Sequence, residues 1–118
     1  MKNIIHVDDD DSFLWMVKEI INNLDFTGAI HSYENPEEAL ELMKEHDTEW
    51  DLLITDYDMP QMNGVTFARE AKKFSDAPII LFSGSKIIFD EVCKELFDFS
   101  IPKFNTPGLY TKLKELLN

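Results

Sequence analysis

Carboxylate side chains follow two of the apolar runs in this 118-residue sequence. Asp8 and Asp9 come directly after the first run, and Asp56 and Asp58 come after the run that begins at Trp50. Carboxylates brought within a few ångströms of one another repel strongly at low dielectric, so a cation must lie between them or one of them must take up a proton. Oxygen ligands without histidine or cysteine nearby favour Mg²⁺. The two acidic pairs therefore indicate a magnesium site.

A hydroxyl group and an amine follow two further apolar runs. Ser83 comes after the run 78–82, and Lys103 comes after a weaker run, 97–101. Magnesium keeps open coordination positions that can hold one phosphoryl oxygen, a lysine supplies a point charge for another, and a hydroxyl can donate a hydrogen bond to a third. These residue types together suit the stabilisation of a phosphoryl group in transfer, with one carboxylate as its acceptor.

The elements that must position these residues alternate five times along the sequence. The predicted strands are 3–7, 29–33, 50–55, 78–82 and 97–101. The predicted helices are 12–24, 35–46, 65–74, a segment that ends at about 96, and a last helix that begins near 105. Five strand–helix units predict an open, doubly wound parallel α/β sheet with helices on both faces. Ligands of such sheets bind at the carboxyl ends of the strands, where all of these polar residues lie.

The composition excludes several classes of function. Asp plus Glu number 23 against 11 Lys plus Arg, which gives a net charge of −12, and the clustered cations that nucleic-acid binding requires are absent. No apolar stretch approaches the roughly 20 residues of a membrane helix, and no signal peptide is recognisable. The single cysteine, Cys93, cannot form an internal disulfide, which favours the cytoplasm. The length predicts one domain that spans 1–118.

Four segments give the sequence a resemblance to a known family. They are 4–10 (IIHVDDD), 52–64 (LLITDYDMPQMNG), 79–84 (IILFSG) and Lys103. The Asp-x-x-Met-Pro-x-Met-x-Gly stretch within the second segment is highly specific. On these residues the chain resembles a stand-alone response regulator receiver domain of two-component signalling, over essentially its whole length. The resemblance implies a flavodoxin-like (βα)5 fold and a regulatory phosphoacceptor, not an enzyme, that assists its own phosphorylation.

The resemblance also implies roles for the acidic residues. Asp56 would be the phosphoacceptor. Asp9 would bind Mg²⁺ directly, Asp8 would act largely through water, and the backbone carbonyl of Asp58 would complete the protein ligands. The implied phosphodonor is a phosphohistidine on a sensor histidine kinase or a histidine phosphotransfer protein. The implied readout is a protein effector in trans, a relay to another histidine, or self-association as a homodimer.

Ser83 and Lys103 would complete the site by contacting the phosphoryl group. The family usually has proline after its lysine, with a cis bond that aims the ammonium, whereas Phe104 follows Lys103 here. A cis bond before a non-proline residue costs about 3 kcal/mol, so we expect either a trans bond with altered lysine placement or a strained cis bond. Ser100 occupies the position of an aromatic residue that commonly moves inward on phosphorylation. We therefore expect the switch formed by Ser83 and Ser100 to be weak or differently built.

Two other functions compete with a phosphorylated receiver. The first is a degenerate receiver that binds partners without being phosphorylated. The second is a phosphatase of the haloacid dehalogenase type, whose Asp-x-Asp pattern is matched by residues 56–58. In that class the nucleophile usually follows the first strand and the acidic pair comes late, whereas the order is reversed here, and the chain is short for such an enzyme.

Several apolar or aromatic residues have no role in this site. Trp15 lies away from the apolar stripe of its helix, so we expect it to be exposed, either as a partner contact or incidentally. Ile87, Ile88 and Phe89 together exceed what one helix face can bury, and we expect them to form part of an interaction surface with the predicted fifth strand and last helix. His6 lies inside a strand and is interpreted as a hydrogen-bonded core histidine.

Overall fold

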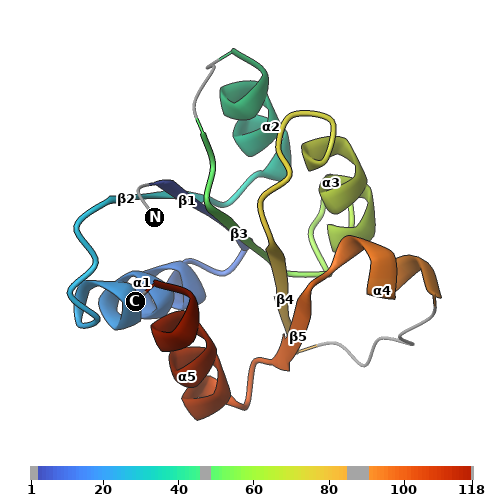
Figure 1. Ribbon diagram of the computed structural model, residues 1–118. Helices are drawn as coiled ribbons and strands as arrows, with labels where there is room; N and C mark the ends of the chain where they lie inside the picture. Colours follow the sequence, from blue (N-terminus) through green and yellow to red (C-terminus); the bar gives the residue numbers. More distant parts are fainter. Residues whose placement is uncertain (1–2, 46–48, 85–90, 118) are drawn as a thin grey trace.

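The structure, a computed structural model, describes residues 3–45, 49–84 and 91–117. The strands are β1 (Asn3–Val7), β2 (Ala29–Tyr33), β3 (Leu52–Thr55), β4 (Ile79–Ser83) and β5 (Phe99–Pro102) (Figure 1). The helices are α1 (Asp11–Asn22), α2 (Pro36–Glu45), α3 (Gly64–Ala71), α4 (Glu91–Leu96) and α5 (Thr106–Leu117). Ile87, Ile88 and Phe89 of the predicted interaction surface lie outside the described residues.

All neighbouring strands pair in parallel, in the order β2-β1-β3-β4-β5. The prediction of an open, doubly wound flavodoxin-like sheet is therefore confirmed. Strand order reverses between β1 and β3, because the chain leaves β1 for β2 on one side and returns to β3 on the other. Such a switch point is where doubly wound sheets bind ligands. Asp8 follows β1 and Asp56 follows β3, so both stand at the switch point.

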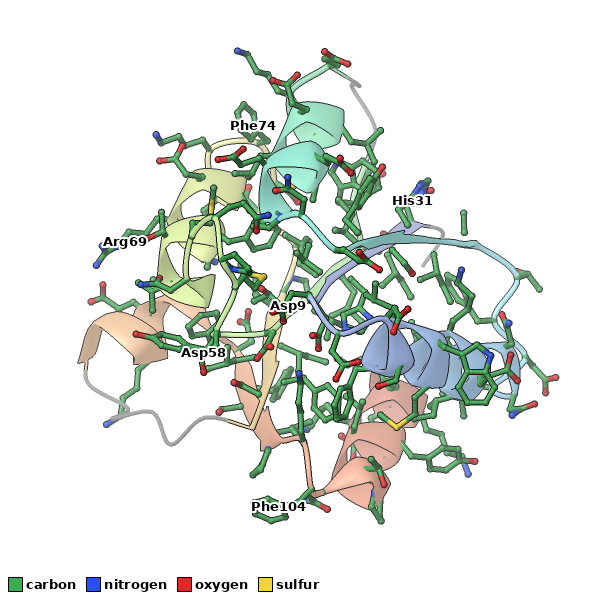
Figure 2. The ribbon with its side chains drawn as sticks, turned by 180° about the vertical axis from the view of Figure 1, so that it is seen from behind. Asp9, His31, Asp58, Arg69, Phe74 and Phe104 are labelled. Atoms are coloured by element: carbon green, nitrogen blue, oxygen red, sulfur yellow. The ribbon has the colours of Figure 1, made fainter. Side chains whose placement is uncertain are left out.

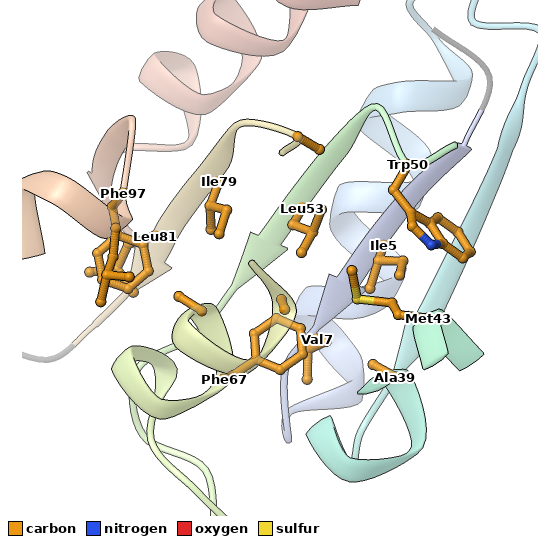
Figure 3. Close-up of a cluster of buried hydrophobic side chains, with 14 of the residues drawn as sticks. Ile5, Val7, Ala39, Met43, Trp50, Leu53, Phe67, Ile79, Leu81 and Phe97 are labelled. Carbon is orange, nitrogen blue, oxygen red and sulfur yellow. The ribbon is translucent and has the colours of Figure 1, made fainter. Parts of the chain in front are cut away.

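Helices cover both faces of the sheet, with α1 and α5 on one face and α2, α3 and α4 on the other (Figure 1). Alternate residues of β1, β3 and β4 supply the two buried clusters, because successive side chains of a strand point to opposite faces. The cluster under α2 and α3 includes Ile5, Leu53, Leu81, Met43 and Phe67 (Figure 3). The cluster under α1 and α5 includes Ile4, Ile54, Phe82, Val17 and Leu109.

Three strands differ from the prediction. β3 begins at Leu52, two residues after Trp50, β4 covers Ile79–Ser83, not 78–82, and β5 covers Phe99–Pro102, not 97–101. Trp50 is 5% exposed and Phe97 is 3% exposed, so both belong to the core without belonging to a strand. An apolar residue type predicts that a side chain is buried. It does not predict where the strand begins, because that depends on which residues pair with the neighbouring strand.

Candidate functional site

Three carboxylates meet at the switch point of the sheet. Asp8, Asp9 and Asp56 each offer an oxygen, and these oxygens all lie within 4.8 Å of one another. Backbone hydrogen bonds extend the strand ladders into the site: the Asp8 N–H donates to Tyr33 O at 3.0 Å, and the Asp56 N–H donates to Val7 O at 3.0 Å. Asp8 is fully buried and Asp56 is 5% exposed, whereas Asp9 is exposed.

One oxygen of each buried carboxylate is held by a backbone amide. Asp8 Oδ1 accepts from the Asp10 N–H at 2.9 Å, and Asp56 Oδ1 accepts from the Tyr57 N–H at 2.7 Å. Asp10 in turn caps α1, accepting from the Ser12 N–H at 3.0 Å. Each amide fixes the orientation of its carboxyl group, so the two Oδ2 atoms are directed to a common region.

Lys103 occupies that common region. Its Nζ lies 2.8 Å from Asp8 Oδ2 as an ion pair and donates a hydrogen bond to Asp56 Oδ2 at 3.1 Å. The lysine side chain is only 13% exposed. No peptide bond between described residues is cis, so the bond from Lys103 to Phe104 is trans. Of the two predicted outcomes the trans bond is correct, and the lysine nonetheless reaches the predicted phosphoacceptor.

Burial and neighbouring charges shift the pKa values of two groups in the site. Burial raises the pKa of Asp8 to about 6, against the opposing effects of Lys103 and the Asp10 amide. Burial lowers the pKa of Lys103, but its contacts with Asp8 and Asp56 outweigh burial, and the net shift is upward. The ammonium is therefore retained at neutral pH. Because the folded chain holds the Asp8 proton more tightly than the unfolded chain, stability is lost as the pH rises from about 4 to about 6, and a bound cation would offset this loss.

The donor set fits Mg²⁺. The three clustered residues offer carboxylate oxygens only, which are hard ligands of the kind that Mg²⁺ takes. The buried Asp8 Oδ2 has no hydrogen-bond partner among the described residues and is compensated only by the Lys103 ion pair. Asp58 is exposed and lies on the loop after β3 (Figure 2). Its backbone carbonyl stays a predicted ligand.

The two predicted switch residues lie in different environments. Ser83 ends β4, is 6% exposed, and its carbonyl accepts from the Lys103 N–H at 3.0 Å. Ser100 is exposed and pairs in register with Leu81, whose side chain belongs to the α2 and α3 face. Phe99 packs against the opposite cluster, as its place in the strand predicts. Only Ser83 is therefore positioned beside Lys103.

The close approach of Gly64 to the site was not predicted. A Cβ atom at Gly64 would lie 2.4 Å from the carbonyl oxygen of Asp56 and 3.1 Å from the Cα of Tyr57. The Gly64 N–H also donates to Tyr57 O at 2.8 Å. The first turn of α3 therefore packs directly on the backbone that carries Asp56. Gly64 is the last residue of the Asp-x-x-Met-Pro-x-Met-x-Gly motif, and its place there could have predicted this close approach.

We expect Gly64→Ala to destabilise the fold by about 2 kcal/mol, the cost of overpacking against backbone that cannot move freely. Alanine is the better helix former by about 1 kcal/mol, so a loss in spite of this preference would identify the steric cause. Urea unfolding measures the difference. Gly84→Ala is the control, because among the described residues its Cβ would meet only the Lys103 Cδ, at an ordinary 3.9 Å. Equal stability of the Gly64 variant and the wild type would contradict the close packing.

The interpretation of His6 as a hydrogen-bonded core histidine is wrong. His6 is 1% exposed, and neither of its ring nitrogens has a partner among the described residues. Burial, together with the charge of Lys103, lowers the pKa of His6 to about 3. Its register neighbour Ser32 likewise has a buried hydroxyl without a partner within the described ranges. Neutral pH thus leaves an uncharged imidazole in the core.

This histidine predicts a loss of stability in acid. Between about pH 6.5 and pH 3 the unfolded chain binds a proton that folded His6 does not, so stability falls by about 1.4 kcal/mol per pH unit as the pH is lowered. Urea unfolding at about pH 7 and pH 4.5 should therefore show a drop about 2–3 kcal/mol larger in the wild type than in His6→Val. The same drop in both proteins would show that His6 is already charged or is not buried.

Trp15 is 66% exposed, as predicted, on α1. Whether it contacts a partner stays a prediction. No helix among the described residues is long and apolar enough to span a membrane.

Comparison with known proteins finds a matching family model, similar solved structures and similar sequences. A family model described as the response regulator receiver domain matches residues 4–105. A crystal structure of the response regulator TrrA from Thermotoga maritima, in complex with Mg²⁺-BeF, superimposes with a TM-score of 0.82 at 33% identity, covering 99% of this chain and 100% of that one. The chemotaxis protein CheY of Bacillus subtilis is 29% identical over 119 residues, 98% of this chain and 97% of that protein.

Other relatives are longer than this chain. A protein-glutamate methylesterase/protein-glutamine glutaminase of Photobacterium profundum is 35% identical over 106 residues, which are 86% of this chain and 26% of that protein. The chain thus spans 26–31% of the length of such relatives.

Proposed function

The chain belongs to the response regulator receiver domain family, and from this premise we propose that it accepts a phosphoryl group on Asp56 with the help of Mg²⁺. The observation that carries the proposal is the grouping of the Asp8, Asp9 and Asp56 carboxylates within 4.8 Å at the switch point of the sheet, with the Lys103 ammonium within 3.1 Å of both Asp8 and Asp56. The whole chain, 1–118, would act as one receiver unit. Its role would be regulatory, since the family is a signalling family and not a class of enzymes.

The residues divide the work of phosphoryl transfer. Asp8, Asp9 and Asp56, with the backbone carbonyl of Asp58, would hold the magnesium ion, which when bound neutralises charge on the phosphoryl oxygens. The Asp56 carboxylate forms a bond to phosphorus as the bond from phosphorus to the donor nitrogen breaks, and the electron pair of that bond returns to the donor's imidazole ring. The product is an acyl phosphate on Asp56.

Lys103 and Ser83 would act on the transferred group. The carboxylates that pair with Lys103 are shared with the proposed ion, so its ammonium becomes available to a phosphoryl oxygen when the site is loaded. The hydroxyl of Ser83 lies at the neighbouring strand end and would donate a hydrogen bond to another oxygen. Both contacts stabilise negative charge that the transfer brings to the site.

The partners we propose follow from this chemistry. The donor would be a phosphohistidine on a sensor histidine kinase or a histidine phosphotransfer protein in the cytoplasm. The readout would be a protein contact, either with an effector in trans or with a second copy of the chain. Trp15 is one exposed side chain that such a contact could use.

A receiver that binds partners without phosphorylation is the second candidate. The observation that favours it is the bridge from Lys103 to both Asp8 and Asp56, which compensates the two buried carboxylates without a metal ion. Incubation with Mg²⁺ and acetyl phosphate separates the two, because an Asp56 acceptor should add the mass of one phosphoryl group to the wild type and none to Asp56→Asn. No added mass with any phosphodonor would support the receiver that binds partners without phosphorylation.

A further inference from the structure

An aromatic ring lies against the ammonium of Lys103. Its Nζ is 4.1 Å from the centroid of the Phe13 ring, on the first turn of α1. A cation over an aromatic face within about 6 Å is attracted by the quadrupole of the ring. Among the described residues, the Lys103 ammonium thus contacts the carboxylates of Asp8 and Asp56 and this uncharged ring.

Packing fixes the ring in this place. Phe13 meets Phe82 edge to face, with centroids 5.9 Å apart and an interplanar angle of 78°. Phe82 is fully buried on β4, immediately before Ser83. Because Phe82 belongs to the central sheet, the position of the Phe13 ring is tied to the strand that also carries the predicted hydroxyl of the site.

The backbone at Lys103 is held by its N–H bond to Ser83 O and by the Asn105 N–H bond to Pro102 O, but the side chain that follows Lys103 adds no support to the ammonium. A proline in the next position would fix its own φ near −65°, but Phe104 stands there and is 88% exposed, projecting from the molecule (Figure 2). The place of the ammonium therefore depends on side-chain contacts. Two of these, to Asp8 and Asp56, are with carboxylates that the proposed magnesium ion would share. The uncharged ring is a contact for which a bound cation does not compete.

We propose that Phe13 is a positioning residue that holds the Lys103 ammonium at the site through its ring face. This inference rests on the proposed phosphorylation of Asp56. The ring keeps the ammonium within reach of the incoming phosphoryl oxygen while the ion takes over the carboxylates. The face of the ring is required, and not merely the apolar volume of the side chain.

The first test measures the contact without any phosphoryl transfer. In a double-mutant cycle of Phe13→Leu and Lys103→Met, we expect the unfolding equilibrium constants to show coupling of at least about threefold. The ε-methylene protons of Lys103 should be shifted upfield by the ring in the wild type, and Phe13→Leu should abolish the shift. No coupling and no shift would overturn the proposal, whether or not the protein is phosphorylated.

The second test measures phosphorylation by acetyl phosphate with Mg²⁺. Phe13→Leu should slow the rate constant about tenfold, whereas Phe13→Tyr, which keeps the ring, should stay within about twofold of the wild type. Phe99→Leu is the matched control. Phe99 carries an equivalent contact, 4.2 Å from Lys112 Nζ, and packs against the same buried cluster as Phe13, but that contact does not involve Lys103.

The outcomes separate this inference from the proposed function. A wild type that takes up no phosphoryl group contradicts the proposed function, and the coupling and proton shifts still decide whether the ring holds Lys103. A phosphorylated wild type with an equally fast Phe13→Leu variant leaves the proposed function standing and overturns the inference. Equal slowing by Phe99→Leu, or by Phe13→Tyr, would also overturn it, because apolar packing and not the ring face would then be responsible.

Discussion

Asp56→Asn is expected to abolish the uptake of a phosphoryl group from acetyl phosphate in the presence of Mg²⁺. A carboxamide cannot form the acyl phosphate, so incorporation should fall below about 1% of that in the wild type. Intact mass spectrometry measures this directly, since the wild type should gain one phosphoryl group. The substitution is nearly isosteric, and Asn can still accept the 2.7 Å hydrogen bond from the Tyr57 N–H. The loss would therefore reflect chemistry and not misfolding.

Asp58→Asn is the matched control for this experiment. It makes the same change of side chain two residues later, at an exposed position on the same loop. Because the proposed role of Asp58 belongs to its backbone carbonyl, the variant should still take up one phosphoryl group. Uptake by Asp56→Asn equal to the wild type would place the acceptor elsewhere. Loss of uptake in the Asp58 variant alone would show that Asp58, and not Asp56, is the acceptor.

Lys103→Met is expected to give the largest loss of stability of any single change at the site. It removes the cation that lies between Asp8 and Asp56, two carboxylates that are 0% and 5% exposed. Breaking a buried ion pair by removing one partner costs about 3–5 kcal/mol, because a buried charge is left without compensation. Urea unfolding in EDTA should show a loss of about 3 kcal/mol at pH 8.

Two changes of condition should restore much of this loss. Saturating Mg²⁺ should stabilise the variant more than the wild type, because the ion replaces the missing positive charge and binds only the folded chain. Lowering the pH toward 6 should reduce the loss, since Asp8 already has a raised pKa of about 6 and can take up a proton that neutralises it. A loss that is insensitive to both conditions would indicate a packing defect.

Lys73→Met serves as the control for Lys103→Met. Lys73 pairs with Glu70 at 2.9 Å, but the two side chains are 63% and 42% exposed. Exposed ion pairs contribute little, so the change should alter stability by less than about 1 kcal/mol. A comparable loss in both variants would mean that removal of any lysine destabilises this acidic chain through its net charge of −12.

Much of the fold was predictable because its signals are local. Apolar runs of strand length alternate with helical patterns, and this alternation alone predicts a parallel sheet covered on both faces. The predicted site residues Asp8, Asp56, Ser83 and Lys103 all stand where a strand ends. Parallel strands bring their carboxyl ends to one edge, so residues separated by nearly 50 positions, such as Asp8 and Asp56, could be placed together from the sequence.

The wrong predictions concern features that depend on tertiary packing. Trp50 and Phe97 read as strand residues because they are apolar, but they fill the core beside the strands. His6 was expected to find a hydrogen-bond partner, yet burial leaves both ring nitrogens without one among the described residues. Residue type predicts whether a side chain is buried more reliably than it predicts what the side chain meets.

The sequence alone determined the family of the chain, the parallel sheet and the set of residues at its carboxyl edge, since each depends on residue type and spacing along the chain. Only the tertiary structure decided how those residues contact one another. The bridge from Lys103 to Asp8 and Asp56 and the Phe13 ring over its ammonium join elements far apart in sequence, and the approach of Gly64 to the Asp56 backbone depends on how α3 packs on the loop after β3. Such contacts depend on how the elements pack together, because a shift of about an ångström is enough to make or break a contact.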